Sequence, residues 1–257
     1  MKNTIKFFGI IAVVAMIGFS MTSCDNGGGG GSGDPGPAFL GSTLELSGWV
    51  YVREWDEDDD SYDLVRYDGT RAITSAGFET DYAWAFFDVD GEITEGQLSL
   101  SIGMPPSSAM VDIGDFFSWK DSFFTNFNIS NRAARITVIQ YIWAVDEWEY
   151  IRIRRERSTP TVWENVLFIY VNTDVSITGG ARTTPRECKC EEWDDNCYCE
   201  ELWGFCRCAL SIITQPINLS LRAGWNAVHE RQEVLSAGLR VTISTGNPAN
   251  IRWIETD

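Results

Sequence analysis

The chain of 257 residues contains one histidine, His229, and only four lysines, Lys2, Lys6, Lys120 and Lys189. A Ser-His-Asp triad would have to use His229, and no G-x-S-x-G nucleophile motif accompanies it. H-E-x-x-H, P-loop and dinucleotide-binding motifs are absent as well. His229 lies in the alternating segment G-W-N-A-V-H-E-R-Q, so we predict that it is a surface or half-buried structural residue.

Positive charge is scarce overall, because 20 Lys and Arg residues face 37 Asp and Glu residues, for a formal net charge of −17. Such a field repels nucleic acid and anionic lipid headgroups, so we predict no nucleic-acid binding and no polybasic membrane patch. The one basic cluster consists of Arg152, Arg154, Arg155 and Arg157. On a strand, Arg152 and Arg154 would share a face. We expect these arginines to pair with the chain's own carboxylates more readily than to form an anion site.

No apolar run reaches the roughly 20 residues that a membrane-spanning helix needs. The run from Phe7 to Phe19 is shorter and follows the positive start of the chain, and the small residues before Cys24 complete the layout of a secretory signal. The ending M-T-S-C resembles the signal of bacterial lipoproteins, in which that cysteine is diacylated and becomes the new N-terminus. The resemblance implies a signal peptide over residues 1–23, lipid attachment at Cys24, and a membrane-anchored place in the bacterial cell envelope.

Residues 24–37 follow as the lipidated cysteine and a Gly-rich tether, because N-G-G-G-G-G-S-G-D-P-G-P has nothing that offsets the entropy of ordering. Residues 38–257 are long enough for one large β domain. From Thr43 onward, alternating segments and turn residues every 8–12 positions predict an all-β antiparallel sandwich or barrel-like domain. A short helix is expected between Val111 and Trp119.

Three hairpins are predicted from turn residues between alternating segments. Asp90-Gly91 marks the first turn and Asp146-Glu147 the second. The third hairpin is expected to join Val162–Val171 to Val175–Thr178 through Asn172–Asp174.

A cysteine-rich cassette over residues 187–208 contains three C-x-C pairs, and its cysteines are Cys188, Cys190, Cys197, Cys199, Cys206 and Cys208. If each pair lies on a strand, both thiols of the pair point to one face, and two turns would make a three-stranded meander. In an exported protein, disulfides that staple a surface excursion are the favoured interpretation. The alternative is a thiolate site for a soft ion such as Zn²⁺ or Cu⁺, although the spacing matches no zinc ribbon or finger.

The acidic run Asp56–Asp60 raises the question of Ca²⁺ binding, but the EF-hand pattern fails at Ser61 and Tyr67. A solvated acidic hairpin loop is the favoured interpretation.

These features predict a non-enzymatic binding or interaction module at a membrane surface that uses no cofactor. Its ligand would be a glycan or a protein, and exposed tryptophans in predicted loops would stack on a glycan: Trp55, Trp148, Trp193 and Trp203. A thiolate metal-binding lipoprotein is the alternative. A cell-surface glycan hydrolase is the weaker one, since no pair of carboxylates stands out in the sequence.

Overall fold

The computed structural model describes residues 38–56, 61–79, 84–119, 127–145, 150–184, 201–202, 205–206 and 211–256. Residue contacts divide the chain into two units, Met1–Gly33 and Asp34–Asp257. Every helix and strand described here belongs to the second unit. No helix in these described ranges is long and apolar enough to cross a bilayer.

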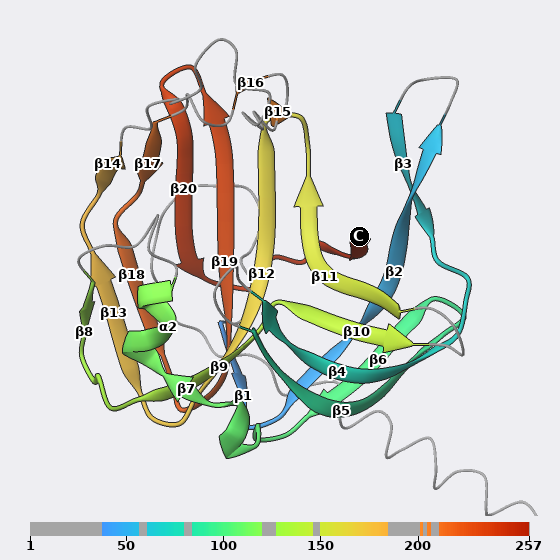
Figure 1. The fold of residues 1–257 in the computed structure, drawn as a ribbon, viewed down its shortest axis with the longest axis horizontal. Helices are drawn as coiled ribbons and strands as arrows, with labels where there is room; N and C mark the ends of the chain where they lie inside the picture. The colour runs from blue at the N-terminus through green and yellow to red at the C-terminus, as the bar shows by residue number, and fades with distance from the viewer. Residues whose placement is uncertain are drawn as a thin grey trace, which may run out of the picture. The chain divides into compact units, whose positions relative to one another are not determined.

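The predicted all-β fold is confirmed, and its centre is a closed barrel of seven strands (Figure 1). Around the barrel the order is β10 (Tyr141–Val145), β4 (Arg71–Glu79), β5 (Trp84–Thr94), β6 (Gln97–Ile102), β2 (Leu44–Asp56), β21 (Arg252–Thr256) and β11 (Tyr150–Ser158), and β11 pairs with β10. A barrel with an odd number of strands cannot close through antiparallel pairs alone. The barrel closes because one of its pairs, β2 with β21, is parallel. These two strands lie near the beginning and the end of the folded unit in the sequence.

An open sheet continues from β11 and shares that strand with the barrel. Its further strands are β12 (Val162–Val171), β19 (Gly224–Leu235), β20 (Gly238–Thr245), β17 (Ile212–Thr214) and β14 (Arg182–Thr184). Three shorter strands extend the open sheet: β1 (Phe39–Gly41) pairs with β19, β9 (Arg135–Ile139) with β12, and β7 (Val111–Asp112) with β9. Strand β3 (Ser61–Arg66) pairs with the barrel strand β2.

A separate three-stranded sheet packs on the open sheet and makes that half of the domain a sandwich. Its order is β18 (Ile217–Leu221), β13 (Val175–Gly179) and β8 (Asn128–Ile129). Helix α2 (Ile113–Trp119) forms within the segment predicted to be helical, and it buries Ile113 and Phe116, which are three residues apart and therefore on one face. A 3-10 turn, Ser107–Ala109, precedes it. The fold is thus both of the predicted architectures joined through β11.

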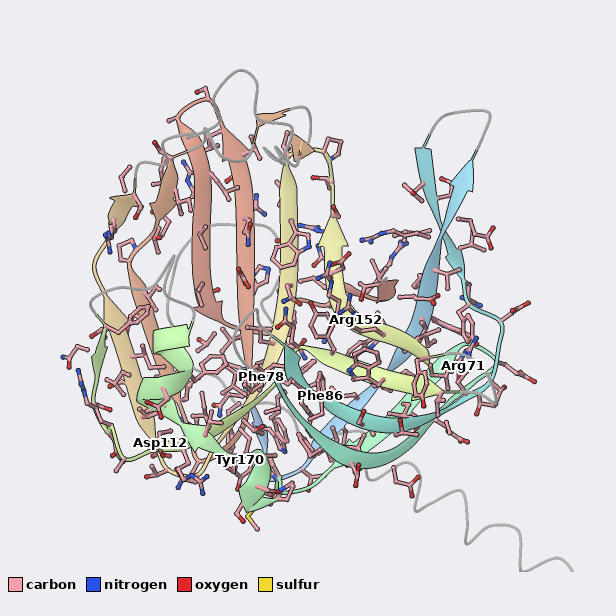
Figure 2. The ribbon with its side chains drawn as sticks, in the orientation of Figure 1. Arg71, Phe78, Phe86, Asp112, Arg152 and Tyr170 are labelled. Atoms are coloured by element: carbon pink, nitrogen blue, oxygen red, sulfur yellow. The ribbon has the colours of Figure 1, made fainter. Side chains whose placement is uncertain are left out.

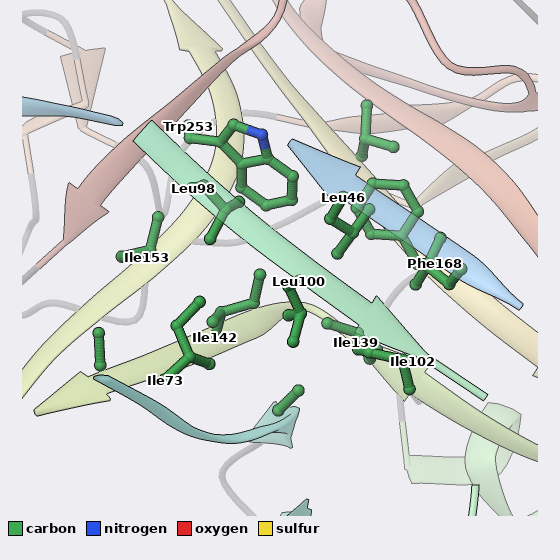
Figure 3. Packing of buried hydrophobic residues seen from close by; sticks show 14 of the residues in the cluster. Leu46, Ile73, Leu98, Leu100, Ile102, Ile139, Ile142, Ile153, Phe168 and Trp253 are labelled. Carbon is green, nitrogen blue, oxygen red and sulfur yellow. The ribbon is translucent and has the colours of Figure 1, made fainter. Parts of the chain in front are cut away.

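Strand β12 is buried on both faces, which explains its nearly continuous apolar sequence. Val166 and Phe168 point into the barrel core, whereas Leu167, Ile169 and Val171 point into the core of the sandwich. In the barrel core, Phe168 stacks on Trp253 with ring centroids 5.9 Å apart, among leucine and isoleucine side chains (Figure 3). One strand therefore holds the two halves of the domain together.

The second predicted hairpin is confirmed by the antiparallel pairing of β10 with β11, and the other two need correction. Strand β5 continues through Asp90-Gly91, and the turn lies at Glu95-Gly96, where both residues have positive φ (49° and 77°). Positive φ at both central residues is typical of the type I′ turn of a two-residue hairpin. The third hairpin was wrong, because the chain crosses after β12 to the three-stranded sheet, so β13 pairs with β18 and β8 instead.

The substitution Phe168→Ala is expected to destabilise the domain by about 3–5 kcal/mol, since it leaves a cavity beside Trp253 where both halves meet. Urea unfolding followed by far-UV circular dichroism measures this. The control Met104→Ala removes a side chain that is 77% exposed and should change stability by less than about 0.5 kcal/mol. Equal losses in the two variants would contradict the central place of β12.

Candidate functional site

The arginine-rich strand β11 presents two charged clusters on opposite faces. As the alternation predicts, Arg152, Arg154 and Glu156 share the outer face of the barrel wall, while Arg155 and Arg157 share the face that continues the barrel core. Within each cluster the central carboxylate is buried: Glu156 has 0% of its side chain exposed.

The first group, here called the Glu164 cluster, consists of Glu164, Arg157, His229 and Arg231. Arg157 donates to Glu164 Oε2, and Arg231 Nη1 donates to Oε1 over 3.3 Å. His229 Nε2 lies 3.3 Å from Glu164 Oε1, and its side chain is 16% exposed. His229 is thus half-buried, as the sequence predicts, and lies beside the carboxylate that the two arginines hold.

Beside this cluster, Arg155 fixes the connection between β20 and β21. Its guanidinium donates to the Ile251 carbonyl (3.3 Å), to the Pro248 carbonyl (3.0 Å) and to Asn247 Oδ1. Burial lowers the pKa of Arg155 from its ordinary value. These contacts give Arg155 a structural role.

The second group is here called the arginine–aromatic face, and its members come from β2, β10, β11 and β12: Arg53, Tyr141, Trp143, Arg152, Arg154, Glu156 and Trp163. Figure 2 labels Arg152 of this face and Phe86 of β5, whose ring borders it. Trp143 meets the Phe86 ring edge to face, with centroids 5.8 Å apart. Two arginines of the basic cluster, Arg152 and Arg154, therefore share this surface with residues of β2, β10 and β12.

Arginines and rings alternate across this face. The Arg154 guanidinium lies 5.4 Å from the Trp163 ring and 6.0 Å from the Tyr141 ring. Arg152 lies 4.7 Å from the Tyr141 ring and 5.8 Å from the Trp143 ring. These distances fall within the range of cation–π attraction. The side chains thus form the row Trp163–Arg154–Tyr141–Arg152–Trp143, in which Tyr141 is buried and Trp143 and Trp163 are half-buried.

Glu156 anchors the face. Its carboxylate accepts hydrogen bonds from Arg53 and from the Trp163 indole Nε1 (3.1 Å), and it forms an ion pair with Arg154. Arg53 belongs to β2, so this contact ties the β2–β3 hairpin to β11. Three donors on one buried carboxylate fix the positions of the side chains around it.

Asn165 and Trp143 at this face have polar side-chain atoms without a hydrogen-bond partner within the described part of the chain. Asn165 is fully buried directly opposite Glu156 in the strand pair, and neither amide atom is paired. The indole Nε1 of Trp143 is likewise unpaired. A buried polar group without any partner costs about 1–3 kcal/mol, so a water molecule or a ligand would be a favourable partner for these atoms.

A second feature of the surface is less suited to ligand binding. A polar hollow of about 290 Å³ lies beside β13 and β18. The described residues that line it include no aromatic ring, and its Asp174 already accepts the Ala223 N–H over 2.8 Å.

Most residues singled out in the sequence lie outside the described ranges. This holds for Cys24 and for Cys188, Cys190, Cys197, Cys199 and Cys208. Cys206 lies in the two-residue strand β16 (Phe205–Cys206), which pairs with β15 (Glu201–Leu202). Among the described residues no group of three or more His, Cys, Asp and Glu side chains forms a metal site.

The aromatic predictions have a similar outcome. Trp148, Trp193, Trp203 and the side chain of Trp55 lie outside the described residues. Residues 57–60 of the acidic run lie outside the described residues, while Asp56 at the end of β2 pairs with Ser61 of β3. Trp143 and Trp163 were missed, because both fall inside alternating strands and nothing in the sequence tells the outer face from the inner one.

Comparison with known proteins gives no further guide, since no protein-family model, no curated protein and no solved structure matches this chain.

The Glu164 cluster generates a pH prediction. Burial lowers the pKa of His229 from 6.5, and the positive charges of Arg231 and Arg157 lower it further, against the opposing effect of Glu164. The unfolded chain therefore binds a proton at His229 at a higher pH than the folded chain does. Stability is then lost as the pH falls from about 6.5 through the lowered folded-state pKa.

Urea unfolding between about pH 8 and pH 5 measures this loss, and His229→Gln should remove it. Since the chain has one histidine, the difference between the two proteins isolates this residue. Identical pH dependence in both would contradict the prediction.

Proposed function

We propose that this chain is an exported, lipid-anchored binding module without enzymatic activity, and that it binds a saccharide at the arginine–aromatic face. The observation that carries the proposal is the row of rings and guanidinium groups around Glu156, in which Trp143 and Trp163 are half-buried. Aromatic faces pack against the apolar faces of sugar rings, while guanidinium groups donate to hydroxyl and carboxylate oxygens.

The carboxylates near this face support binding over hydrolysis. Glycoside hydrolysis needs two carboxyl groups facing one bond. The buried carboxylates Glu156 and Glu164 instead lie on opposite faces of the β11–β12 pair, and each is held by arginines. Neither is placed to share a substrate with the other.

The N-terminal sequence supplies the proposed location. Lipid on Cys24 would hold the protein at a membrane of the cell envelope, and the Gly-rich residues that follow would let the domain turn toward a ligand beyond the headgroups.

The anchor is tested by Cys24→Ser, which should move the protein from the membrane fraction to the soluble fraction because no acyl chain can be attached. Metabolic labelling with a palmitate analogue should mark the unaltered protein and not the variant. A variant that stays in the membrane fraction would contradict lipid anchoring.

Saccharide binding is tested by titrating a panel of neutral and charged oligosaccharides by calorimetry. Trp143→Ala should weaken binding to the best member by about tenfold, equal to about 1.4 kcal/mol, because it removes one of the two half-buried tryptophan rings of the face. Trp49→Ala is the matched control, since Trp49 is also half-buried under an arginine, Arg66, 3.6 Å from its ring centroid, yet lies outside the face.

The expected result is unchanged affinity in Trp49→Ala, with thermal melts showing that both variants are folded. A panel without any binding partner, or equal losses in the two variants, would contradict the proposed function.

A further inference from the structure

We infer that the ligand of the arginine–aromatic face is an acidic saccharide that carries carboxylates, as in a uronate-containing glycan. This inference rests on the proposed function and adds the charge and the chemical class of the ligand.

The cations of this face stand in contrast to the negative net charge of the chain. The chain as a whole has a net charge of −17, yet among the described residues two arginines, Arg53 and Arg154, surround the one buried carboxylate of this face, Glu156. A further arginine, Arg252, lies directly opposite Glu156 on the neighbouring strand β21 and is exposed. An anion that meets this face is attracted there and repelled over most of the remaining surface, which selects the binding position as well as the ligand.

The arginine side chains around Glu156 are more exposed than its carboxylate. Arg154 is 20% exposed and Arg53 is 36% exposed, so the cations around the buried Glu156 reach the surface while the carboxylate does not. A ligand therefore meets guanidinium groups, not the acid that holds them. The planar guanidinium fork matches the two oxygens of a carboxylate.

Aromatic rings and guanidinium groups lie next to one another on this face. The guanidinium groups of Arg152 and Arg154 lie within cation–π distance of the half-buried rings of Trp143 and Trp163, respectively. A ligand that alternates a flat apolar ring face with a carboxylate at the ring's rim fits this arrangement.

The test uses the full-length chain in neutral detergent and three probes of similar length: oligogalacturonate, its fully methyl-esterified form, and a neutral galactose oligosaccharide. The acid form should bind at least about tenfold more tightly than its ester, which keeps the rings and removes the charge. Binding of the acid form should weaken as salt is raised from about 0.01 to 0.5 M, while binding of the ester should not. These comparisons use the unaltered protein, so they do not depend on the folding of a variant.

A pair of variants then locates the charge. Arg152→Gln should lower affinity for the acid form by about tenfold and leave affinity for the ester within about twofold. Arg182→Gln removes the same charge from an exposed position on β14, beyond β12, β19, β20 and β17, and should change neither.

The outcomes separate the two proposals. Equal binding of the acid and its ester would overturn the inference and leave saccharide binding intact. A similar loss in Arg152→Gln and Arg182→Gln would also overturn it, because net charge alone would then be the cause. If none of the three probes and no member of the wider panel binds, the proposed function itself fails.

Discussion

The structure around the candidate site depends on the burial of one carboxylate, Glu156. It has no exposed surface, and its contacts come from β2, β11 and β12: Arg53, Arg154 and the indole of Trp163. Removing a charge from water costs several kcal/mol, and a well-formed buried ion pair roughly offsets that cost. Glu156 is therefore better understood as a residue that fixes geometry than as a source of net stability. It sets where two guanidinium groups lie, and the rings beside them complete the arginine–aromatic face.

Sixteen of the twenty basic residues are arginines. Arginine stacks on aromatic rings at several places in the described structure, and the stacking residues are Arg66, Arg71, Arg152, Arg154, Arg155, Arg222 and Arg252. A lysine ammonium group is compact and strongly hydrated, and it has no planar face to lay on a ring. In a strand-rich domain with many aromatic residues, arginine is the cation that binds both a carboxylate and a ring.

Local patterns predict the β class because each strand needs one or two apolar faces, and they predict which arginines share a face of β11 because side chains alternate. They do not predict closure of the barrel, which depends on β2 meeting β21 from the other end of the domain. The error over the third hairpin has the same cause: Val162–Val171 is apolar on both faces, and no local signal shows that its partners are β11, β9 and β19. The sequence predicts that Arg152 and Arg154 share a face. It does not predict the rings of the site, because Tyr141, Trp143 and Trp163 join the arginines only through strand pairing.

The central claim is that Arg53 and Glu156 act as a unit that positions the face, and a double-mutant cycle tests it most directly. Unfolding free energies would be measured for the unaltered protein, Arg53→Gln, Glu156→Gln and the double variant. The account predicts a coupling energy of about 1–3 kcal/mol, with Glu156→Gln the more damaging single change because it also leaves Arg154 without its buried partner. Effects that add within about 0.5 kcal/mol would contradict it.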